Sequence, residues 1–148
     1  MASDTDLINL YSGRILALAA DIPCLERLTD PMGSVKKRSP LCGSTVSVDV
    51  SVENGRVSAF GQDVKACALG QAAAAVTAGS VIGCRLEDLI KARDELRLML
   101  KEDGDVPAAP FHGFDVLQPA RDYKNRHASI LLCIEATCEA MEQASQSN

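Results

Sequence analysis

The sequence contains no tryptophan and only 3% aromatic residues, so it offers few side chains on which nucleic-acid bases could stack. Its net charge is -5, and its only notable basic run is Lys36-Lys37-Arg38. Because binding to a phosphate backbone needs a basic surface, we expect no nucleic acid among its main partners. The sequence also lacks an apolar stretch long enough to cross a bilayer, so we expect no membrane partner.

The first six residues are acidic and lack the basic and apolar segments of a secretory leader. We therefore expect a cytoplasmic protein whose cysteines stay reduced. The six cysteines are Cys24, Cys42, Cys67, Cys84, Cys133 and Cys138. Such cysteines serve packing, metal binding or catalysis. Common catalytic patterns are absent: the sequence has no Gly-x-Ser-x-Gly elbow, no phosphate loop and no His-Glu-x-x-His motif.

The length of 148 residues predicts a single domain over 1–148, with residues 1–3 and 145–148 as flexible ends. Valines alternate with polar residues from Val46 to Val52, which predicts a half-buried strand. Asn54-Gly55 predicts a tight hairpin turn into a second strand over 56–64, with a bulge at Gly61.

Four other segments have apolar residues at helical spacing, namely 7–20, 68–79, 86–100 and a last one that starts at about 121 or 124 and ends at 144. Residues 106–114 contain two prolines and are expected to form a crossing loop, and an edge strand is expected near Val35. The predicted fold class is therefore α+β, with a small antiparallel sheet of about three strands packed against several helices.

Two cysteines lie where the chain changes direction. Cys42 stands between Pro40 and Gly43 at the entry to the first strong strand, and Ser44 shares its strand face if the strand has begun there. Cys67 lies between the second strand and an alanine-rich helix, whose unpaired N–H groups favour a thiolate. Each position also suits a small packing cysteine, so a ligand role and a packing role both stay open.

His127 opens the last helix on the apolar stripe of that helix, so we expect it to point inward. A core histidine is the more frequent role at such a position, and a metal ligand is the alternative. His112 is expected at the surface. We expect Cys24, Cys84, Cys133 and Cys138 to serve packing.

These motifs resemble those of the NifU-like N-terminal family of iron–sulfur cluster assembly scaffolds, the IscU/SufU type. The family's Pro-x-Cys-Gly-Asp turn is matched by residues 40–44, and its Gly-Cys-Ala-Ile-Ser-Gln-Ala helix start is matched by residues 66–72. The family's late His-Cys-Ser segment corresponds to His127-Ala128-Ser129, or, in another alignment, His127 takes the cysteine position. The resemblance implies a SufE/NifU-like fold.

The resemblance implies a metal or cluster site formed by Cys42, Cys67 and His127, with Ser44 as a weak partner. Ser44 replaces the family's aspartate and Ala128 its third cysteine, so the site is less anionic and should hold a metal less strongly. Two thiolates and one imidazole suit zinc with an open fourth position, and they also suit iron in a [2Fe–2S] cluster.

The implied function is a non-enzymatic scaffold or carrier that receives sulfur from a cysteine desulfurase and passes a cluster to acceptor proteins. Cys67 or Cys42 would accept the persulfide sulfur, and two copies could pair around a cluster as a homodimer. A zinc-dependent sulfur-relay protein is the second hypothesis. The third is an interaction module that keeps the fold without cluster chemistry.

Overall fold

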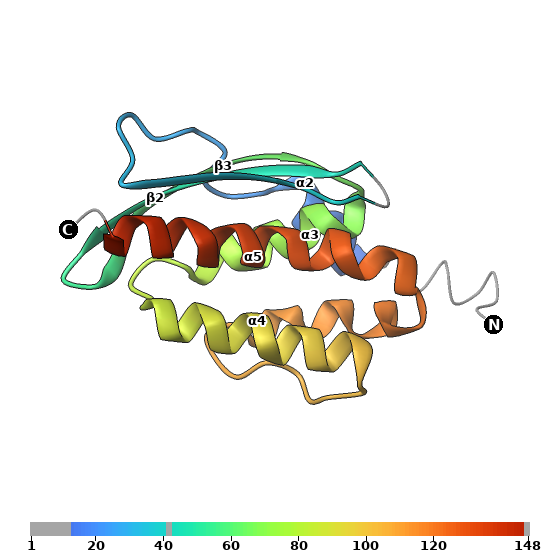
Figure 1. Cartoon of the computed structure of the whole chain (residues 1–148). Coiled ribbons are helices and arrows are strands. Elements are labelled where there is room, and N and C mark those ends of the chain that lie inside the picture. Colours follow the sequence, from blue (N-terminus) through green and yellow to red (C-terminus); the bar gives the residue numbers. More distant parts are fainter. Residues whose placement is uncertain (1–12, 41–42, 147–148) are drawn as a thin grey trace.

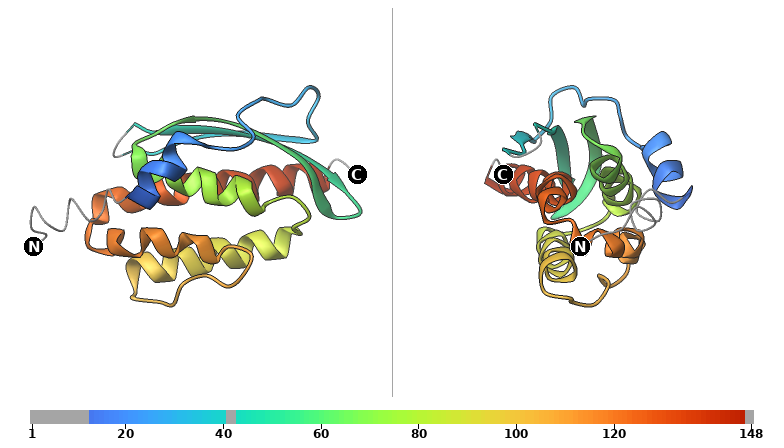
Figure 2. Two further views of the ribbon diagram at one scale, coloured as in Figure 1. Left: turned by 180° about the vertical axis from the view of Figure 1, so that it is seen from behind. Right: turned by 90° about the vertical axis from the view of Figure 1, so that its right-hand side faces the viewer.

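The structure, a computed structural model, describes residues 13–40 and 43–146. Its elements in chain order are α2 (Gly13–Ala20), β1 (Gly33–Arg38), β2 (Thr45–Glu53), β3 (Arg56–Lys65), α3 (Ala68–Ser80), α4 (Leu86–Lys101), the 3₁₀ helix η1 (His112–Asp122) and α5 (Lys124–Gln146). The sheet forms one layer, α3 and α5 pack against it, and α4 with η1 forms a further layer beneath them (Figure 1). The views in Figure 2 show the same arrangement, with α2 beside α3.

The sheet has three antiparallel strands in the order β1-β2-β3, which confirms the predicted sheet. Asn54 and Gly55 both have positive φ, 55° and 75°, as a two-residue hairpin turn requires. The predicted bulge at Gly61 is wrong, because Gly61 pairs regularly with Asp49. The irregularity lies nearer the turn, where the pairing shifts between Ser51 and Val52 of β2.

Gly61 is required for a different reason. The segment that follows α2 crosses the outer face of the sheet, and its backbone lies directly over this residue (Figure 2). A Cβ at Gly61 would collide with the carbonyl oxygen of Glu26 and lie 3.1 Å from the nitrogen of Leu28. Glycine therefore permits the crossing segment to lie flat on the sheet.

The core lies between the sheet and the helices. Val46, Val48 and Val50 are almost completely buried on the inner face of β2, as the alternation predicts. The expectation that the strand is half-buried is wrong, because Ser47 and Asp49 on its other face are buried too. Helix α3 contributes a run of alanines, which allows it to pack closely against its neighbours. At Gly33 a Cβ would collide with the carbonyl oxygen of Ala140, so β1 and α5 also approach each other closely.

The helices confirm most of the pattern-based prediction. Helices α3, α4 and α5 match the predicted segments, while residues 7–12 of the first predicted helix lie outside the described residues. The loop expected over 106–114 is wrong at its end, because η1 begins at His112 and continues to Asp122. A 3₁₀ helix has three residues per turn and leaves no 3.6-residue pattern to detect. Within the described chain, no helix is both long and apolar enough to span a bilayer.

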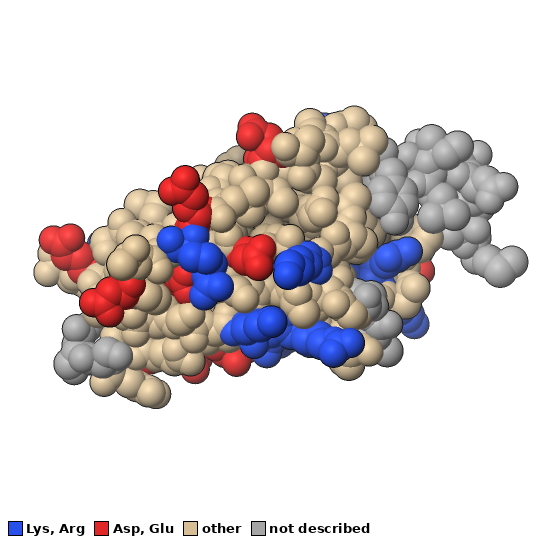
Figure 3. Space-filling model, turned by 90° about the horizontal axis from the view of Figure 1, so that it is seen from above, with Lys and Arg blue, Asp and Glu red and all other residues tan. Residues whose placement is uncertain are grey.

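The outer face of the sheet is charged. Figure 3 shows lysine and arginine side chains over its middle and toward one end, with acidic side chains mostly at the other end. Strand β1 is an edge strand, and its Lys36 and Arg38 are exposed. Lysine and arginine on an edge strand discourage pairing with a strand of another molecule.

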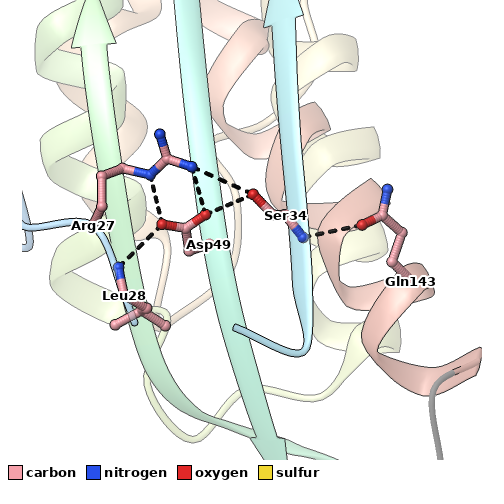
Figure 4. A network of polar contacts seen from close by, with 5 residues as sticks. All are labelled: Arg27, Leu28, Ser34, Asp49 and Gln143. Carbon is pink, nitrogen blue, oxygen red and sulfur yellow. Dashed lines mark hydrogen bonds and ion pairs between the residues drawn. The ribbon is translucent and has the colours of Figure 1, made fainter. Parts of the chain in front are cut away.

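A buried carboxylate ties the crossing segment to the sheet (Figure 4). Asp49 accepts bonds from Arg27 Nε at 2.6 Å and Nη2 at 2.8 Å, from Leu28 N at 3.1 Å and from Ser34 Oγ at 2.7 Å. The backbone nitrogen of Ser34 in turn donates to Gln143 of α5 at 3.0 Å. The bonds from Arg27 hold the pKa of Asp49 below its usual value, against the opposing effect of burial.

We expect Gly61→Ala to lower the free energy of unfolding by about 1–3 kcal/mol, because the new methyl group would displace the crossing backbone. Urea denaturation measures this change. The matched control is Gly79→Ala in α3, where the new Cβ has no atom within 4 Å apart from its chain neighbours and the backbone of its own helix. This control should gain up to about 1 kcal/mol from helix propensity. Equal effects of the two substitutions would contradict the crossing constraint.

We expect Asp49→Asn to destabilise the protein by about 1–3 kcal/mol at pH 7, where the charged carboxylate bonds to Arg27. Because the folded-state pKa of Asp49 is lowered, this advantage is complete above the unfolded pKa, about 4. It should shrink as the pH falls through the folded-state pKa. Urea denaturation from pH 7 downward measures the difference. Glu53→Gln, at the exposed end of the same strand, should show little effect at any pH.

Candidate functional site

Cys67 lies at the start of α3, directly after β3, where the sequence placed it. Its backbone is extended, with φ of -66° and ψ of 169°, and its carbonyl oxygen accepts the first helical bond from Gln71 at 2.9 Å. The side chain is partly exposed and makes no capping bond to the helix. The first turn of α3 contains no acidic residue, so the N–H groups there can face a thiolate.

One buried hydroxyl group lies next to this thiol, and a second lies next to the first. Ser129 Oγ of α5 is 3.5 Å from Cys67 Sγ and 3.2 Å from Ser44 Oγ, which immediately precedes β2. Ser129 is 2% exposed and Ser44 5% exposed. If Ser44 donates to Ser129, the Ser129 hydroxyl can donate to the Cys67 sulfur. A chain of hydrogen bonds can therefore stabilise negative charge on that sulfur.

Gly70 permits this contact. It lies within the first turn of α3, and a Cβ there would be 2.7 Å from Ser129 Oγ and 3.3 Å from the Ser129 carbonyl oxygen. A larger residue would force the Ser129 hydroxyl out of this position. The glycine therefore allows the Ser129 hydroxyl to reach Cys67.

The turn between β1 and β2 brings Ser44 to the same place. The Ser39 nitrogen donates to the Ser44 carbonyl oxygen at 2.8 Å, and the Gly43 nitrogen donates to the Ser39 carbonyl oxygen at 3.1 Å. Gly43 has a φ of 71°, which favours glycine. Cys42 lies outside the described residues, so its ligand role stays a prediction. It is covalently joined to Gly43 and is two residues from Ser44.

His127 is buried, at 3% exposure, as its position on the apolar stripe predicts. Its Nε2 is 3.1 Å from the carbonyl oxygens of both Ala120 and Arg121, so this nitrogen carries the proton and faces η1. Burial is the main cause that lowers the pKa of His127. Two residues that are two positions apart on an α-helix point about 200° away from each other. Ser129 therefore lies on the side of α5 that faces Cys67, and His127 lies on the opposite side.

The structure thus brings together Ser44, Cys67 and Ser129, but directs the Nε2 of His127 to other partners. Within residues 13–40 and 43–146, no three His, Cys, Asp or Glu side chains are grouped closely enough to hold a metal ion. The predicted set of Cys42, Cys67 and His127 stays a prediction, because one member is not described. Ligation by His127 together with Cys67 would require a different arrangement at the start of α5.

Ser129 had no role in the sequence analysis. The one signal for it is a polar residue on an otherwise apolar stripe of α5 that includes Cys133 and Ala136. The motif alone could not separate Ala128 from Ser129, since one step along a helix turns a side chain by about 100°.

Three of the remaining cysteines are buried, namely Cys84, Cys133 and Cys138, in agreement with a packing role. Burial raises the pKa of Cys133 and of Cys138 to about 12. Cys24 is partly exposed in the segment that crosses the sheet, and its carbonyl oxygen accepts a bond from the nitrogen of Gln62. His112 is exposed, as expected.

The chain is similar to the N-terminal part of a nitrogen-fixing NifU-like protein from Brucella abortus, with 40% sequence identity and a TM-score of 0.92 over 95% of this chain and 98% of that one. This likeness shows that the chain belongs to the NifU-like N-terminal family, as its motifs suggested. No family model matches the sequence, and no curated protein does.

Two other solved structures share the fold at lower identity. One is a candidate iron–sulfur cluster assembly scaffold protein for the SUF system from the thermophile Fervidobacterium islandicum, with 15% identity, a TM-score of 0.79 and coverage of 89% of this chain and 96% of that one. The other is a hypothetical protein solved at 2.3 Å, with 19% identity, a TM-score of 0.80 and coverage of 90% and 97%.

We expect iodoacetamide to alkylate Cys67 in the native protein roughly tenfold or more faster than Cys133 and Cys138, which are buried and protonated. Fragment mass spectrometry of digested protein assigns the modified residues over time. Cys133 and Cys138 should react only after denaturation, and Cys67→Ser should remove the early modification at that position. Early labelling of Cys133 would contradict the described burial.

Proposed function

We propose that the protein is a scaffold or carrier for iron–sulfur cluster assembly and has no catalytic turnover of its own. The observation that carries the proposal is the partly exposed Cys67 thiol at the start of α3, next to the hydroxyl of Ser129. Membership of the NifU-like family supports it, together with a fold shared with a candidate SUF-system scaffold.

Cys67 and Cys42 are the proposed ligands for iron, which is cargo here. Thiolates are the preferred protein ligands of iron in such clusters. Ser44 and Ser129 supply neutral hydroxyls where a carboxylate or a thiolate would hold a cation more strongly. Weak binding suits a carrier, because the cluster must leave for an acceptor protein. His127 keeps its place in the predicted ligand set only if its side chain leaves the carbonyl oxygens of Ala120 and Arg121.

Sulfur would arrive as a persulfide from a cysteine desulfurase. The Cys67 thiolate attacks the outer sulfur of the persulfide, a new S–S bond forms on Cys67, and the S–S bond on the donor breaks. The donor cysteine leaves as a thiolate, so the step needs no external oxidant or reductant. The Ser129 hydroxyl can donate a hydrogen bond to the attacking sulfur or to the persulfide that forms.

A zinc-dependent sulfur relay is the second candidate. One observation favours it: the described part of the site contains a single thiol and two hydroxyls, and one thiol is enough to carry a persulfide. In the relay, zinc held by the predicted set would tune the thiol, and no cluster would accumulate.

Anaerobic reconstitution with ferrous iron and a desulfurase tests both candidates. For the scaffold we expect iron and acid-labile sulfide to bind together, with visible absorption, and Cys67→Ser and Cys42→Ser each to lose most of both. Cys24→Ser is the matched control, since Cys24 is also partly exposed but lies in the segment across the sheet. His127→Ala should retain the iron if the histidine stays bonded to η1, and its loss of iron would support the predicted set.

Zinc retention with persulfide on Cys67 and no iron would support the relay. Undiminished iron and sulfide in both cysteine variants would contradict the proposed site. If the wild type binds neither iron nor zinc and carries no persulfide, the interaction module is the remaining hypothesis.

We also expect Ser129→Cys to retain iron more strongly than the wild type, because it adds a thiolate within reach of Cys67. Competition with a chelator measures the retention. Ser129→Ala removes the same hydroxyl without adding a ligand and serves as the control. If the two variants release iron equally fast, Ser129 does not face the bound iron.

A further inference from the structure

A second feature lies on the other side of α5. The end of α4, the end of η1 and the start of α5 enclose a hollow of about 340 Å³. Its wall includes Lys101, Arg121, Lys124 and the buried His127. The volume lies within the range of small-molecule sites in proteins.

Cations from three different elements meet at this hollow. Lys101 ends α4, Arg121 belongs to η1 and Lys124 begins α5. Two carboxylates also line it. Asp103 forms an ion pair with Arg121 Nη1 at 3.2 Å but is largely exposed, and Asp122 is exposed as well. Arg121 Nε is buried and has no hydrogen-bond partner among the described residues. Lys101 and Lys124 are exposed too, so the three cations exceed the two carboxylates by one charge. The hollow is therefore mildly positive in a chain whose net charge is -5.

The start of α5 adds to this excess. The N–H groups at the N-terminus of a helix form the positive end of its dipole, which acidic residues normally stabilise. Helix α4 follows this rule with Glu87 and Asp88 in its first turn. The first turn of α5 contains no acidic residue and begins with Lys124. Lys124 and the positive helix end repel each other here. Asp122 and Asp103 offset part of this positive charge, and a bound anion would offset the rest.

The His127 ring forms one wall of the hollow. Lys101 and Lys124 line it together with the His127 ring. The His127 proton is held by the carbonyl oxygens of Ala120 and Arg121, so the ring forms a fixed wall and the lysines and arginine remain as donors.

We propose that this hollow binds the phosphate or carboxylate group of a small anionic molecule. The site is separate from Cys67, since His127 and Ser129 lie on opposite sides of α5, and the proposal does not depend on cluster assembly. Lys101 and Lys124 supply charge, and the Arg121 guanidinium supplies directed donors that suit an oxyanion.

The test is an NMR titration of the ¹⁵N-labelled chain with inorganic phosphate and, separately, with acetate, at constant ionic strength set with chloride. We expect saturable shifts in the amide signals of residues 101 and 121–127. The double variant Lys101→Ala/Lys124→Ala should bind at least tenfold more weakly. The matched control, Lys36→Ala/Arg38→Ala, removes two exposed cations from β1 and should bind as the wild type does.

The two anions distinguish the chemistry. Tighter binding of phosphate indicates that the natural ligand carries a phosphate group, whereas tighter binding of acetate indicates a carboxylate. Either result supports the proposal. Shifts that do not saturate, that chloride reproduces, or that persist unchanged in the Lys101→Ala/Lys124→Ala variant would overturn it. As a second readout, phosphate should raise the melting temperature of the wild type and of the control more than that of the variant.

Discussion

The close packing of α5 against α3 and the sheet is the constraint on which the rest of the structure depends. Helix α5 contacts β1, β2, α3, α4 and η1, so its position sets the geometry on every side. Two glycines allow the approach: Gly70 beneath Ser129, and Gly33 against Ala140. A buried helix that approaches its neighbours this closely can hardly rotate without collisions. Its rotation therefore determines that Ser129 faces Cys67 and that His127 faces η1.

The chemistry of the site follows from the two neutral hydroxyls near Cys67. A carboxylate or a thiolate attracts a cation by its charge, whereas Ser44 and Ser129 attract it only by their dipoles. The same hydroxyls can still donate hydrogen bonds to a sulfur anion on Cys67. The site should therefore favour the handling of sulfur over the firm retention of metal. Both steps belong to cluster assembly, and the balance between them separates a scaffold from a relay.

Local patterns predicted the fold well where the interactions are local. Alternating valines and Asn54-Gly55 were enough for the hairpin, because strand faces and turn dihedrals depend on neighbouring residues. Gly61 was misinterpreted as a bulge, since its contact is with Glu26, which lies far away in sequence. The same limit applies to the site. The place of Cys67 at a strand-to-helix junction could be predicted, but its partner Ser129 could not.

By itself, the sequence determined the class of the fold, the family and the position of Cys67 at the start of a helix. Each of these depends on residues that are adjacent or regularly spaced along the chain. Only the tertiary structure decided which residue of α5 meets that cysteine, and that His127 belongs to the wall of a separate basic hollow. The physical reason is that long-range packing sets how a helix is rotated about its axis. One step along the helix turns the side-chain direction by about 100°, so neighbouring residues face different partners.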